Sequence, residues 1–366
     1  MNILAVELRD FRNLAAVLVE PHGRMNVLAG DNGQGKTNFI EALFLVGTLR
    51  AFRAQRSDEL VRFGATDGLV RARVGRRGLE RHYEVLLVGH PAQKRARVDG
   101  KAVRAADYFG GFNVVLFAPE DLRLLKGPPS ERRRFLDRAV WNAEASYLAD
   151  AQTFERVLKS RNALLRAAQH GRFDVAQLEV YDAQLAASAT RVVERRRRYL
   201  DVLAPLVVAA HARITSAGHA VELRYAGELL EGGPEGYGPR LLAALVADRG
   251  RDRERGHTHA GPHSDDLEVL LDGRPARAHA SQGQTRAIVL ALKIAEIEHL
   301  AETLGEPPIL LLDDVSSELD ATRTAQLFEF VAGLDCQTFL TTTAPGSLPL
   351  PADRRDFQVN TGDVRA

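Results

Sequence analysis

The sequence predicts an α/β protein with a phosphate-binding loop and a compact helical lobe. Three observations lead to this prediction. A glycine-rich loop at 30–37 lies between an apolar run and a segment with helical spacing. A second apolar run, at 308–312, ends in two aspartates. The stretch 130–204 contains no proline and one glycine, and Leu, Ala, Arg and Glu dominate it. Strands that alternate with helices are typical of α/β folds.

Length and composition limit the class of protein. The 366 residues suggest two domains, or one domain with an insertion. A single cysteine, Cys336, excludes an intrachain disulfide and favours a reducing, cytoplasmic compartment. No run approaches the roughly 20 apolar residues that a membrane span needs, so we expect no membrane partner. The start of the chain alternates like a strand and lacks the pattern of a signal peptide.

The charges are balanced in total but not along the chain. The chain has 49 Lys and Arg residues and 48 acidic residues, for a net charge of +1. Taken alone, this near-neutral charge argues against a nucleic-acid partner. However, residues 71–104 hold ten basic residues against three acids, and 301–366 hold four against eleven. Basic clusters also occur at 132–134 and 195–198. Such local excess can attract a polyanion, so these segments are candidate DNA contacts.

The elements follow from periodicity in chain order. Alternating runs at 4–8, 15–19 and 25–29 predict strands, and apolar spacing after Thr37 predicts a helix. Further strands are expected at 83–88 and 113–117, then two or three antiparallel helices over 130–204. A helix of about 30 residues would span roughly 45 Å, which is too short for an extended coiled coil. A mixed region covers 205–270, 281–304 is helical, and strands follow at 308–312 and 337–342. We therefore divide the chain into a first lobe at 1–125, a helical lobe at 126–205 and a remaining part at 206–366.

The glycine-rich loop predicts phosphate binding. Its residues fit the pattern G-x-x-x-x-G-K-[ST] and are Gly30, Asp31, Asn32, Gly33, Gln34, Gly35, Lys36 and Thr37, with Asn38 next in the chain. The position between a strand and a helix is the context that this motif requires. Backbone N–H groups and the helix N-terminus would face the phosphate oxygens. Lys36 would reach the β- and γ-phosphates of a nucleotide, and the Thr37 hydroxyl would bind Mg²⁺.

Three further motifs follow later in the chain. We expect Asp313 to coordinate Mg²⁺ and Asp314 to orient or deprotonate the attacking water. The string Ser281, Gln282, Gly283 and Gln284 lies just before a helix that begins near Thr285, and a helix start again suits a phosphate. The string 317–320, which ends in Asp320, follows the acidic pair by two residues.

In this order and spacing, the motifs resemble the Walker A, signature, Walker B and D-loop motifs of ABC-type ATPases. Within that group the chain is similar, over nearly its full length, to the RecF family of bacterial recombination and gap-repair proteins. The closer resemblance rests on the strings 10–14, 33–38, 117–122, 126–129, 132–137, 161–165 and 261–266.

The resemblance implies an SMC-like ATPase head that has mixed β-sheets and a short helical arm. It implies a homodimer that forms when ATP and Mg²⁺ bind, with Ser281 and Asp320 of one subunit acting at the nucleotide of the other. Glu120 would contact the Mg²⁺ or the attacking water, as the glutamine of the ABC Q-loop does. The implied partners are double-stranded DNA, single-strand/double-strand junctions, RecO and RecR, with RecA loading as the outcome.

The chain departs from the family patterns at three places. Asp314 stands where ABC ATPases usually carry Glu, and a misplacement of about 1 Å can cost on the order of a hundredfold in rate. We therefore expect slow hydrolysis that serves as a switch. Threonines at 341–343 replace a switch histidine, so a hydroxyl would bond the γ-phosphate. Ser264 stands where the family string would have Arg.

Other interpretations of these motifs remain open. The chain could be an ABC-type ATPase subunit that drives a membrane or other protein partner, or a nucleotide kinase. The 75-residue helical insertion argues against the first, and the signature string would have no role in the second. Among His257, His259, His263, Asp265 and Asp266 we expect a structural loop, since zinc usually requires a tighter ligand set. Arg53 and Arg56 could sense nucleotide or DNA, and Trp141 is expected in the core of the helical lobe.

Overall fold

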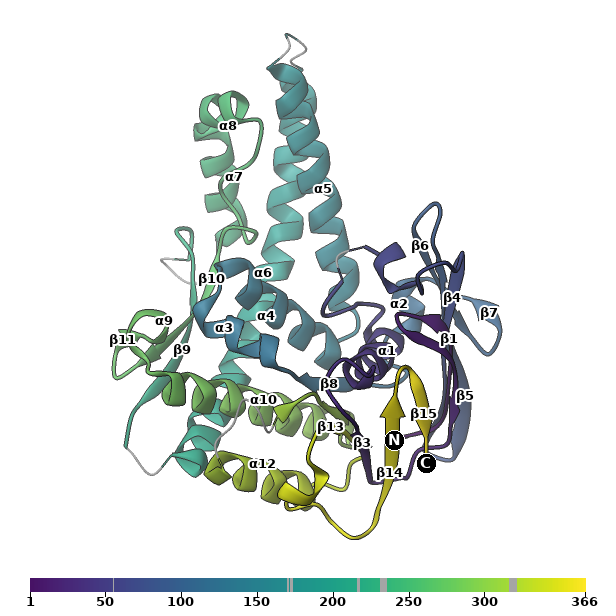
Figure 1. The fold of residues 1–366 in the computed structure, drawn as a ribbon. Helices are drawn as coiled ribbons and strands as arrows, with labels where there is room; N and C mark the ends of the chain where they lie inside the picture. The colour runs from purple at the N-terminus through teal and green to yellow at the C-terminus, as the bar shows by residue number, and fades with distance from the viewer. Residues whose placement is uncertain (55, 170, 172–173, 216–217, 231–235, 316–320) are drawn as a thin grey trace. The chain divides into compact units, whose positions relative to one another are not determined.

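The computed structural model describes residues 1–54, 56–169, 171, 174–215, 218–230, 236–315 and 321–366 (Figure 1). The chain divides into two compact units. The first, which we call the sheet unit, comprises 1–122, 213–216 and 286–366. The second, the helical unit, comprises 123–212 and 217–285. The sequence-based division ended the helical lobe at 205, whereas this unit also takes in residues up to 285.

The sheet unit contains two six-stranded sheets. An antiparallel sheet has the order β2-β1-β4-β5-β6-β7, and a mainly parallel sheet has the order β15-β14-β3-β13-β12-β8. The strands of the first are β1 (Asn2–Phe11), β2 (Leu14–Val19), β4 (Asp67–Arg76), β5 (Leu79–Val88), β6 (Gln93–Val98) and β7 (Lys101–Ala102). Those of the second are β3 (Met25–Ala29), β8 (Val114–Phe117), β12 (Ile309–Leu312), β13 (Thr338–Thr342), β14 (Arg354–Asn360) and β15 (Asp363–Arg365).

Helices complete the sheet unit. Its helical segments are α1 (Lys36–Thr48), η1 (Asp58–Leu60), α2 (Ala105–Tyr108), η2 (Pro119–Leu122), most of α10 (Gln282–Leu304), α12 (Ala321–Gly333) and η3 (Pro345–Ser347). The helix α1 contacts strands of both sheets, because apolar side chains surround it. Phe39, Ile40 and Leu43 are fully buried in a core that also holds Val6 of β1 and Phe339 of β13. This core fixes the direction of α1 relative to the strand that precedes it.

The parallel sheet brings the candidate motifs to one edge. The strand β3 pairs in parallel with β13, and β13 pairs in parallel with β12, so all three end at the same edge. Residues 30–37 follow β3, while Asp313 and Asp314 follow β12. In open α/β sheets, ligands bind at the carboxyl ends of the strands. All three strands were expected from the sequence.

The helical unit is built on three long helices and a small sheet. Its segments are α3 (Arg123–Lys126), α4 (Pro129–Ala143), α5 (Tyr147–Ala168), α6 (Val175–Ile214), α7 (Tyr237–Ala247), α8 (Arg249–Arg255) and α9 (Ala276–His279). The sheet has the order β11-β10-β9, formed by β9 (Val221–Ala226), β10 (Asp266–Leu271) and β11 (Arg274–Pro275). Trp141 is 3% exposed, as expected for a core residue.

The longest helix of the described residues exceeds the sequence prediction. The helix α6 has 40 residues and passes through Pro205, where the periodicity argument had ended the helical stretch. At 1.5 Å per residue it spans about 60 Å rather than about 45 Å. Proline removes one backbone donor and usually ends a helix. Here Leu203 and Val207, on either side of Pro205, are fully buried, so packing holds both turns in place.

Candidate nucleotide-binding site

The loop between β3 and α1 has a backbone that only glycine can adopt at two positions. Gly30 has φ of 154°, and a Cβ atom there would lie 2.3 Å from the Val359 carbonyl oxygen. Gly35 has φ of 121°, and its Cβ would lie 2.9 Å from Asn13 Oδ1. Any side chain at these positions would push the loop away from its neighbours. The glycines therefore let the chain fold closely around the N-terminus of α1.

Lys36 lies over this loop. Its Nζ donates to the carbonyl oxygens of Gly30 and Asp31, each at 2.7 Å. Burial lowers the pKa of Lys36, while the carboxylates of Asp314, Asp313 and Asp31 oppose that shift. The ammonium group is therefore placed at the centre of the loop, beside the backbone N–H groups at the start of a 13-residue helix. A helix start and a positive side chain together suit a phosphate.

Thr37 and Asp313 meet as the sequence predicts for a Mg²⁺ site. Thr37 Oγ1 donates to Asp313 Oδ1 at 3.0 Å, and Thr341 Oγ1 donates to the same oxygen at 2.8 Å. Burial raises the pKa of Asp313, and the nearby Glu120 and Asp314 carboxylates add to this shift. A bound cation would offset the free-energy cost of keeping the buried Asp313 carboxylate ionised. Hydroxyl and carboxylate oxygens are the ligands that Mg²⁺ prefers, so the donor set fits this ion.

Asp314 follows with an uncommon backbone conformation. Its φ is 47°, in the left-handed region, where Asp and Asn are several-fold more frequent than most side chains. Its backbone N–H donates to Thr341 Oγ1 at 2.9 Å. Thr341 is one of the three threonines at 341–343 that stand in place of a switch histidine. Its hydroxyl bridges the two aspartates, which fixes their relative orientation.

Glu120 lies close enough to the acidic pair to act on it. It belongs to η2, directly after β8, the strand that pairs with β12. Its charge contributes to the raised pKa of Asp313, and Arg53 Nε lies 3.9 Å from its Oε1. The side chain is 42% exposed, so it can reach a ligand at this edge. Arg56, the other arginine singled out in the sequence, pairs with Asp58 at 2.7 Å.

Two distant segments hold the loop, and sequence reasoning missed their role. The Gln34 carbonyl oxygen accepts from Asn13 Nδ2 at 3.0 Å and from the Gly362 N–H at 2.8 Å. The Gln34 side-chain oxygen accepts from the Thr361 N–H at 2.6 Å. Asn38 Nδ2 donates to Asn13 Oδ1 at 2.8 Å, so Asn38 holds Asn13 in place. Asn13 lies in a string that was noted only for its resemblance, and nothing in the sequence indicated Thr361.

The signature string lies in the helical unit, at the start of α10. Ser281 and Gln282 are exposed. The Gln284 N–H donates to Ser281 Oγ at 3.2 Å and the Ser281 N–H donates to Gln284 Oε1 at 2.8 Å, a reciprocal capping box. The helix therefore begins at Gln282 rather than near Thr285, because the string itself forms the cap. Asp320, in the D-loop string at 317–320, lies outside the described residues.

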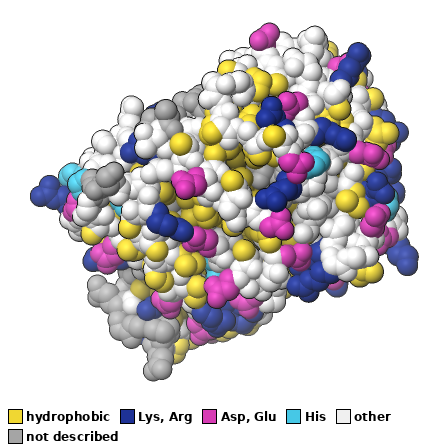
Figure 2. Space-filling view, turned by 90° about the horizontal axis from the view of Figure 1, so that it is seen from below, with side chains coloured by type: hydrophobic (Ala, Val, Ile, Leu, Met, Phe, Trp, Pro, Cys, Tyr) yellow, Lys and Arg dark blue, Asp and Glu magenta, His cyan; other side chains and the backbone are white. Residues whose placement is uncertain are grey.

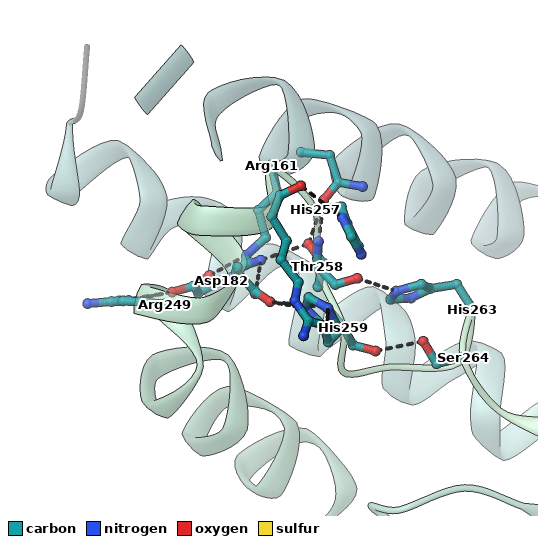
Figure 3. Close-up of polar contacts among 11 residues, drawn as sticks. Arg161, Asp182, Arg249, His257, Thr258, His259, His263 and Ser264 are labelled. Atoms are coloured by element: carbon teal, nitrogen blue, oxygen red, sulfur yellow. Dashed lines mark hydrogen bonds and ion pairs between the residues drawn. The ribbon is translucent and has the colours of Figure 1, made fainter. Parts of the chain in front are cut away.

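The histidine-rich loop is held by a hydrogen bond to α8 and by hydrogen bonds within the loop (Figure 3). His259 Nδ1 lies 2.7 Å from Asp252 Oδ1, His263 Nε2 lies 3.0 Å from the Thr258 carbonyl oxygen, and Ser264 Oγ donates to the His259 carbonyl oxygen at 2.6 Å. Burial lowers the pKa of His263. Among the described residues, no cluster of three or more His, Cys, Asp or Glu side chains could hold a metal ion.

Buried ion pairs anchor the same loop. Arg161 is fully buried and donates to Asp182 Oδ1 and Asp252 Oδ2, each at 2.7 Å. It also donates to Thr258 Oγ1 at 2.7 Å. Asp182 lies on α6 and Asp252 on α8, so one guanidinium joins three helices and the loop (Figure 3). These contacts hold the histidine-rich loop against the helices, which agrees with the structural loop expected from the sequence.

Two of the basic clusters are only partly exposed, because one arginine of each is buried in an ion pair, while Arg134 and Arg198 are exposed. Arg132 is 5% exposed and pairs with Asp266, and Arg196 is 4% exposed and pairs with Asp137. Arg195 pairs with Asp150 at 3.0 Å. A run of arginines in the sequence does not show whether acidic residues far along the chain pair with those arginines in the folded protein. On the face in Figure 2, basic and acidic side chains are interspersed among the described residues.

Comparison with known proteins places the chain in a family. Residues 2–350 match the RecF/RecN/SMC N-terminal domain family. The chain is 45% identical over 354 residues to the DNA replication and repair protein RecF of Myxococcus xanthus, covering 95% of this chain and 92% of that protein. It is 39% identical over 376 residues to the same protein of Geobacter sp. strain M21, covering all of both chains. The chain belongs to the RecF family.

Solved structures agree with this family. A structure of the recombination mediator protein RecF with ATP shares 30% identity with a TM-score of 0.90, covering 99% of this chain and 96% of that one. An Smc head bound to the C-winged helix domain of ScpA has 15% identity and a TM-score of 0.57, which shows a shared fold alone. The chain thus has the SMC-type ATPase head fold expected of RecF proteins. Within the described residues, no helix is long and apolar enough to span a membrane.

Proposed function

We propose that the chain binds ATP and Mg²⁺ at the β3–α1 loop. Residues 30–38 would hold the phosphates, with Lys36 on the β- and γ-phosphates. Thr37 and Asp313 would hold the ion. The observation that carries this proposal is the 3.0 Å contact between Thr37 Oγ1 and Asp313 Oδ1, beside the Lys36 ammonium. Bound Mg²⁺ would neutralise phosphate charge, and this chain supplies only part of its ligands, which is typical of such sites.

The nucleoside would extend toward an open pocket of about 1030 Å³ beside the loop. The pocket is lined on the loop side by Asn13, Asn38 and Thr361, and on the other side by Arg12, Arg53 and Phe63. Arg12 is held in place by the buried Glu41, which accepts from its Nε at 2.9 Å. Amide, guanidinium and aromatic groups suit the hydroxyls and the flat base of a nucleoside. We therefore place the ribose and base on this side of the phosphates.

Hydrolysis would be slow. Asp314 would orient or deprotonate the attacking water, and Glu120 would contact the water or the Mg²⁺. A dimer would complete the site, with the exposed Ser281 and the following helix N-terminus of one subunit facing the γ-phosphate held by the other. Asp320 would act at the same interface. Because ATP binds the dimer better than the monomer in this scheme, it shifts the equilibrium toward the dimer.

The names of the relatives support a proposal for the cellular role. RecF relatives carry the name of DNA replication and repair proteins, and one solved RecF is described as a recombination mediator in the RecFOR pathway. We infer that this chain acts in the cytoplasm, at the nucleoid, on double-stranded DNA and on junctions at single-strand gaps. RecO and RecR would be its partners and RecA loading the result. Slow hydrolysis would then release the DNA.

DNA binding under controlled nucleotide and salt conditions tests this function. With ATP and Mg²⁺ the protein is expected to bind a labelled gapped duplex at least tenfold more tightly than with no nucleotide, because only the dimer presents two copies of the DNA surface. Affinity should fall steeply between about 50 and 200 mM salt, since phosphate contacts release counterions. Lys36→Met should remove the ATP effect. Equal affinity with and without ATP in the unchanged protein would reject the proposal.

A further inference from the structure

A short hairpin leads the chain into the signature string. The strands β10 and β11 are joined by Asp272 and Gly273, whose φ values are 50° and 74°. Positive φ at both positions is the conformation of the tight two-residue turn that an Asp-Gly pair favours. The chain then passes through β11 and α9 to Ser281. All of these residues belong to the helical unit.

Asp272 fixes a histidine at the start of the neighbouring strand. Its Oδ1 accepts from the Ala220 N–H at 2.9 Å, and its own N–H donates to the Ala220 carbonyl oxygen at 2.8 Å. Its Oδ2 lies 2.7 Å from His219 Nδ1. The hydrogen bonds from Ala220 and His219 lower the pKa of Asp272, which keeps its side chain a carboxylate. A carboxylate can only accept, so Nδ1 of His219 carries the hydrogen.

His219 in turn holds the glutamine of the signature string. With the hydrogen on Nδ1, Nε2 of the neutral ring is an acceptor, and it lies 3.3 Å from Nε2 of Gln284. The Gln284 amide uses both of its ends, because its Oε1 accepts from the Ser281 N–H at 2.8 Å. The contacts form one chain from a carboxylate through an imidazole and an amide to the backbone of Ser281. Each donor in this chain meets an acceptor because the ring has this tautomer.

This chain of hydrogen bonds keeps the serine hydroxyl in a defined place. Ser281 Oγ accepts from the Gln284 N–H at 3.2 Å, so its own O–H remains a donor for a phosphate. The side chains of His219 and Asp272 are 40% and 51% exposed, and Ser281 is exposed as well. A surface group that is already held in its binding conformation loses less freedom when it meets a ligand.

We propose that His219 and Asp272 are positioning residues for the signature string, which act through Gln284 on Ser281. The inference rests on the proposed function, because it takes the string to face the γ-phosphate held by the partner subunit. It adds that one ring tautomer of a histidine outside all of the motifs, 65 residues before Gln284, prepares the string for that phosphate.

Variants that keep the shape but change the hydrogen bonding test this role. Asp272→Asn keeps an oxygen for the Ala220 N–H and then presents its NH₂ group to His219, which moves the ring hydrogen to Nε2. That hydrogen opposes the NH₂ group of Gln284, so either this contact or the cap on Ser281 is lost. His219→Ala removes the link, whereas His219→Gln retains an oxygen that can accept from the Gln284 amide.

The readouts are the ATP affinity of the monomer, measured at low protein concentration, and the ATP-dependent dimer Kd from sedimentation. Asp272→Asn and His219→Ala are expected to raise the dimer Kd at least about fivefold, because each dimer contains two copies of the contact. The ATP Kd of the monomer should stay within about twofold. His219→Gln should recover most of the dimer, and the control His82→Ala, at an exposed histidine of β5, should match the unchanged protein.

A double variant shows whether the histidine acts through the glutamine. Gln284→Ala removes the amide that His219 is proposed to hold. In that background, His219→Ala should change the dimer Kd by less than about twofold, because the two substitutions break the same chain of contacts.

The ring nitrogens give a readout that a purely structural role would not change. In the monomer, the ¹⁵N chemical shifts of the His219 ring should show the hydrogen on Nδ1. In Asp272→Asn they should show it on Nε2. Comparison with His219→Gln assigns the signals. The same tautomer in both proteins would overturn the inference.

The inference can fail while the proposed function stands. If ATP forms a dimer that Ser281→Arg abolishes, but Asp272→Asn and His219→Ala leave the dimer Kd unchanged, these residues do not position the string. An equal loss from His219→Ala with and without the Gln284 amide would also overturn the inference. If the unchanged protein forms no ATP-dependent dimer, the proposed function fails and the inference fails with it.

Discussion

At the scale of single residues, the edge of the parallel sheet is organised around one carboxylate oxygen. Asp313 Oδ1 accepts from Thr37 at 3.0 Å and from Thr341 at 2.8 Å, and the same Thr341 hydroxyl accepts the Asp314 N–H at 2.9 Å. The helix α1 and the strands β12 and β13 thereby fix the two aspartates relative to the phosphate loop. The left-handed conformation of Asp314 gives a second reason for aspartate rather than glutamate here, besides the side-chain length considered from the sequence.

Asp314→Asn tests the role of this residue in hydrolysis. Asparagine keeps the size and also tolerates the left-handed backbone, but it cannot accept a proton. We expect kcat for ATP to fall by about 10²–10⁴, the usual contribution of a general base, with little change in nucleotide Kd. Asp335→Asn is the control, because Asp335 is 92% exposed and lies before β13, at the end of the strand away from Asp313. Retained turnover in Asp314→Asn would exclude it as the base.

The sequence predicted correctly where residues within motifs lie, but it did not predict the contacts that these residues make with distant parts of the chain. Lys36, Thr37 and Asp313 lie where the motif spacing predicts, because local pattern and sheet topology both constrain them. Thr361 holds the loop through Gln34, across 327 residues of chain, and no local pattern encodes that contact. The same limit explains why Arg196 was taken for a surface residue, since its partner Asp137 is 59 residues away.

At the scale of elements, periodicity found nearly every strand and helix of the nucleotide-binding edge. The main departure is α6, which continues through Pro205 to Ile214. Proline is a reliable helix breaker only where tertiary packing does not oppose it. Packing of the long helices depends partly on Arg161, which joins α5, α6 and α8 through fully buried acids.

Arg161→Met should destabilise the helical lobe. It removes the guanidinium and leaves Asp182 and Asp252 buried, although Arg249 still pairs with Asp182 at 2.9 Å. Breaking a buried ion pair in this way costs about 3–5 kcal/mol in the free energy of unfolding. Denaturant unfolding measures this loss. Arg156→Met on the exposed face of α5 is the control and should change stability by less than about 0.5 kcal/mol. Similar stability of the two variants would contradict this role of Arg161.

At the scale of the whole molecule, the near-neutral net charge does not show which arginines pair with acidic side chains and which are exposed. Many of them pair with acids inside one chain, as Arg71 does with Glu7 and Glu84. In the proposed function, DNA contacts would come from exposed residues such as Arg95 and Lys101, rather than from the buried members of the arginine runs. Two copies brought together by ATP would double them, which is why the account depends on an ATP-dependent dimer.

Sedimentation of the protein with ATP, with ADP and without nucleotide tests this dimer most directly. The account predicts a dimer only for the unchanged protein with ATP and Mg²⁺. Lys36→Met should remain a monomer because it loses the phosphate contact. Ser281→Arg should bind ATP yet remain a monomer, since the exposed Ser281 would face the partner's γ-phosphate, while Ser347→Arg on an exposed turn outside the motifs should dimerise normally. An ATP-dependent dimer of Ser281→Arg, or a dimer that forms equally without nucleotide, would contradict the account.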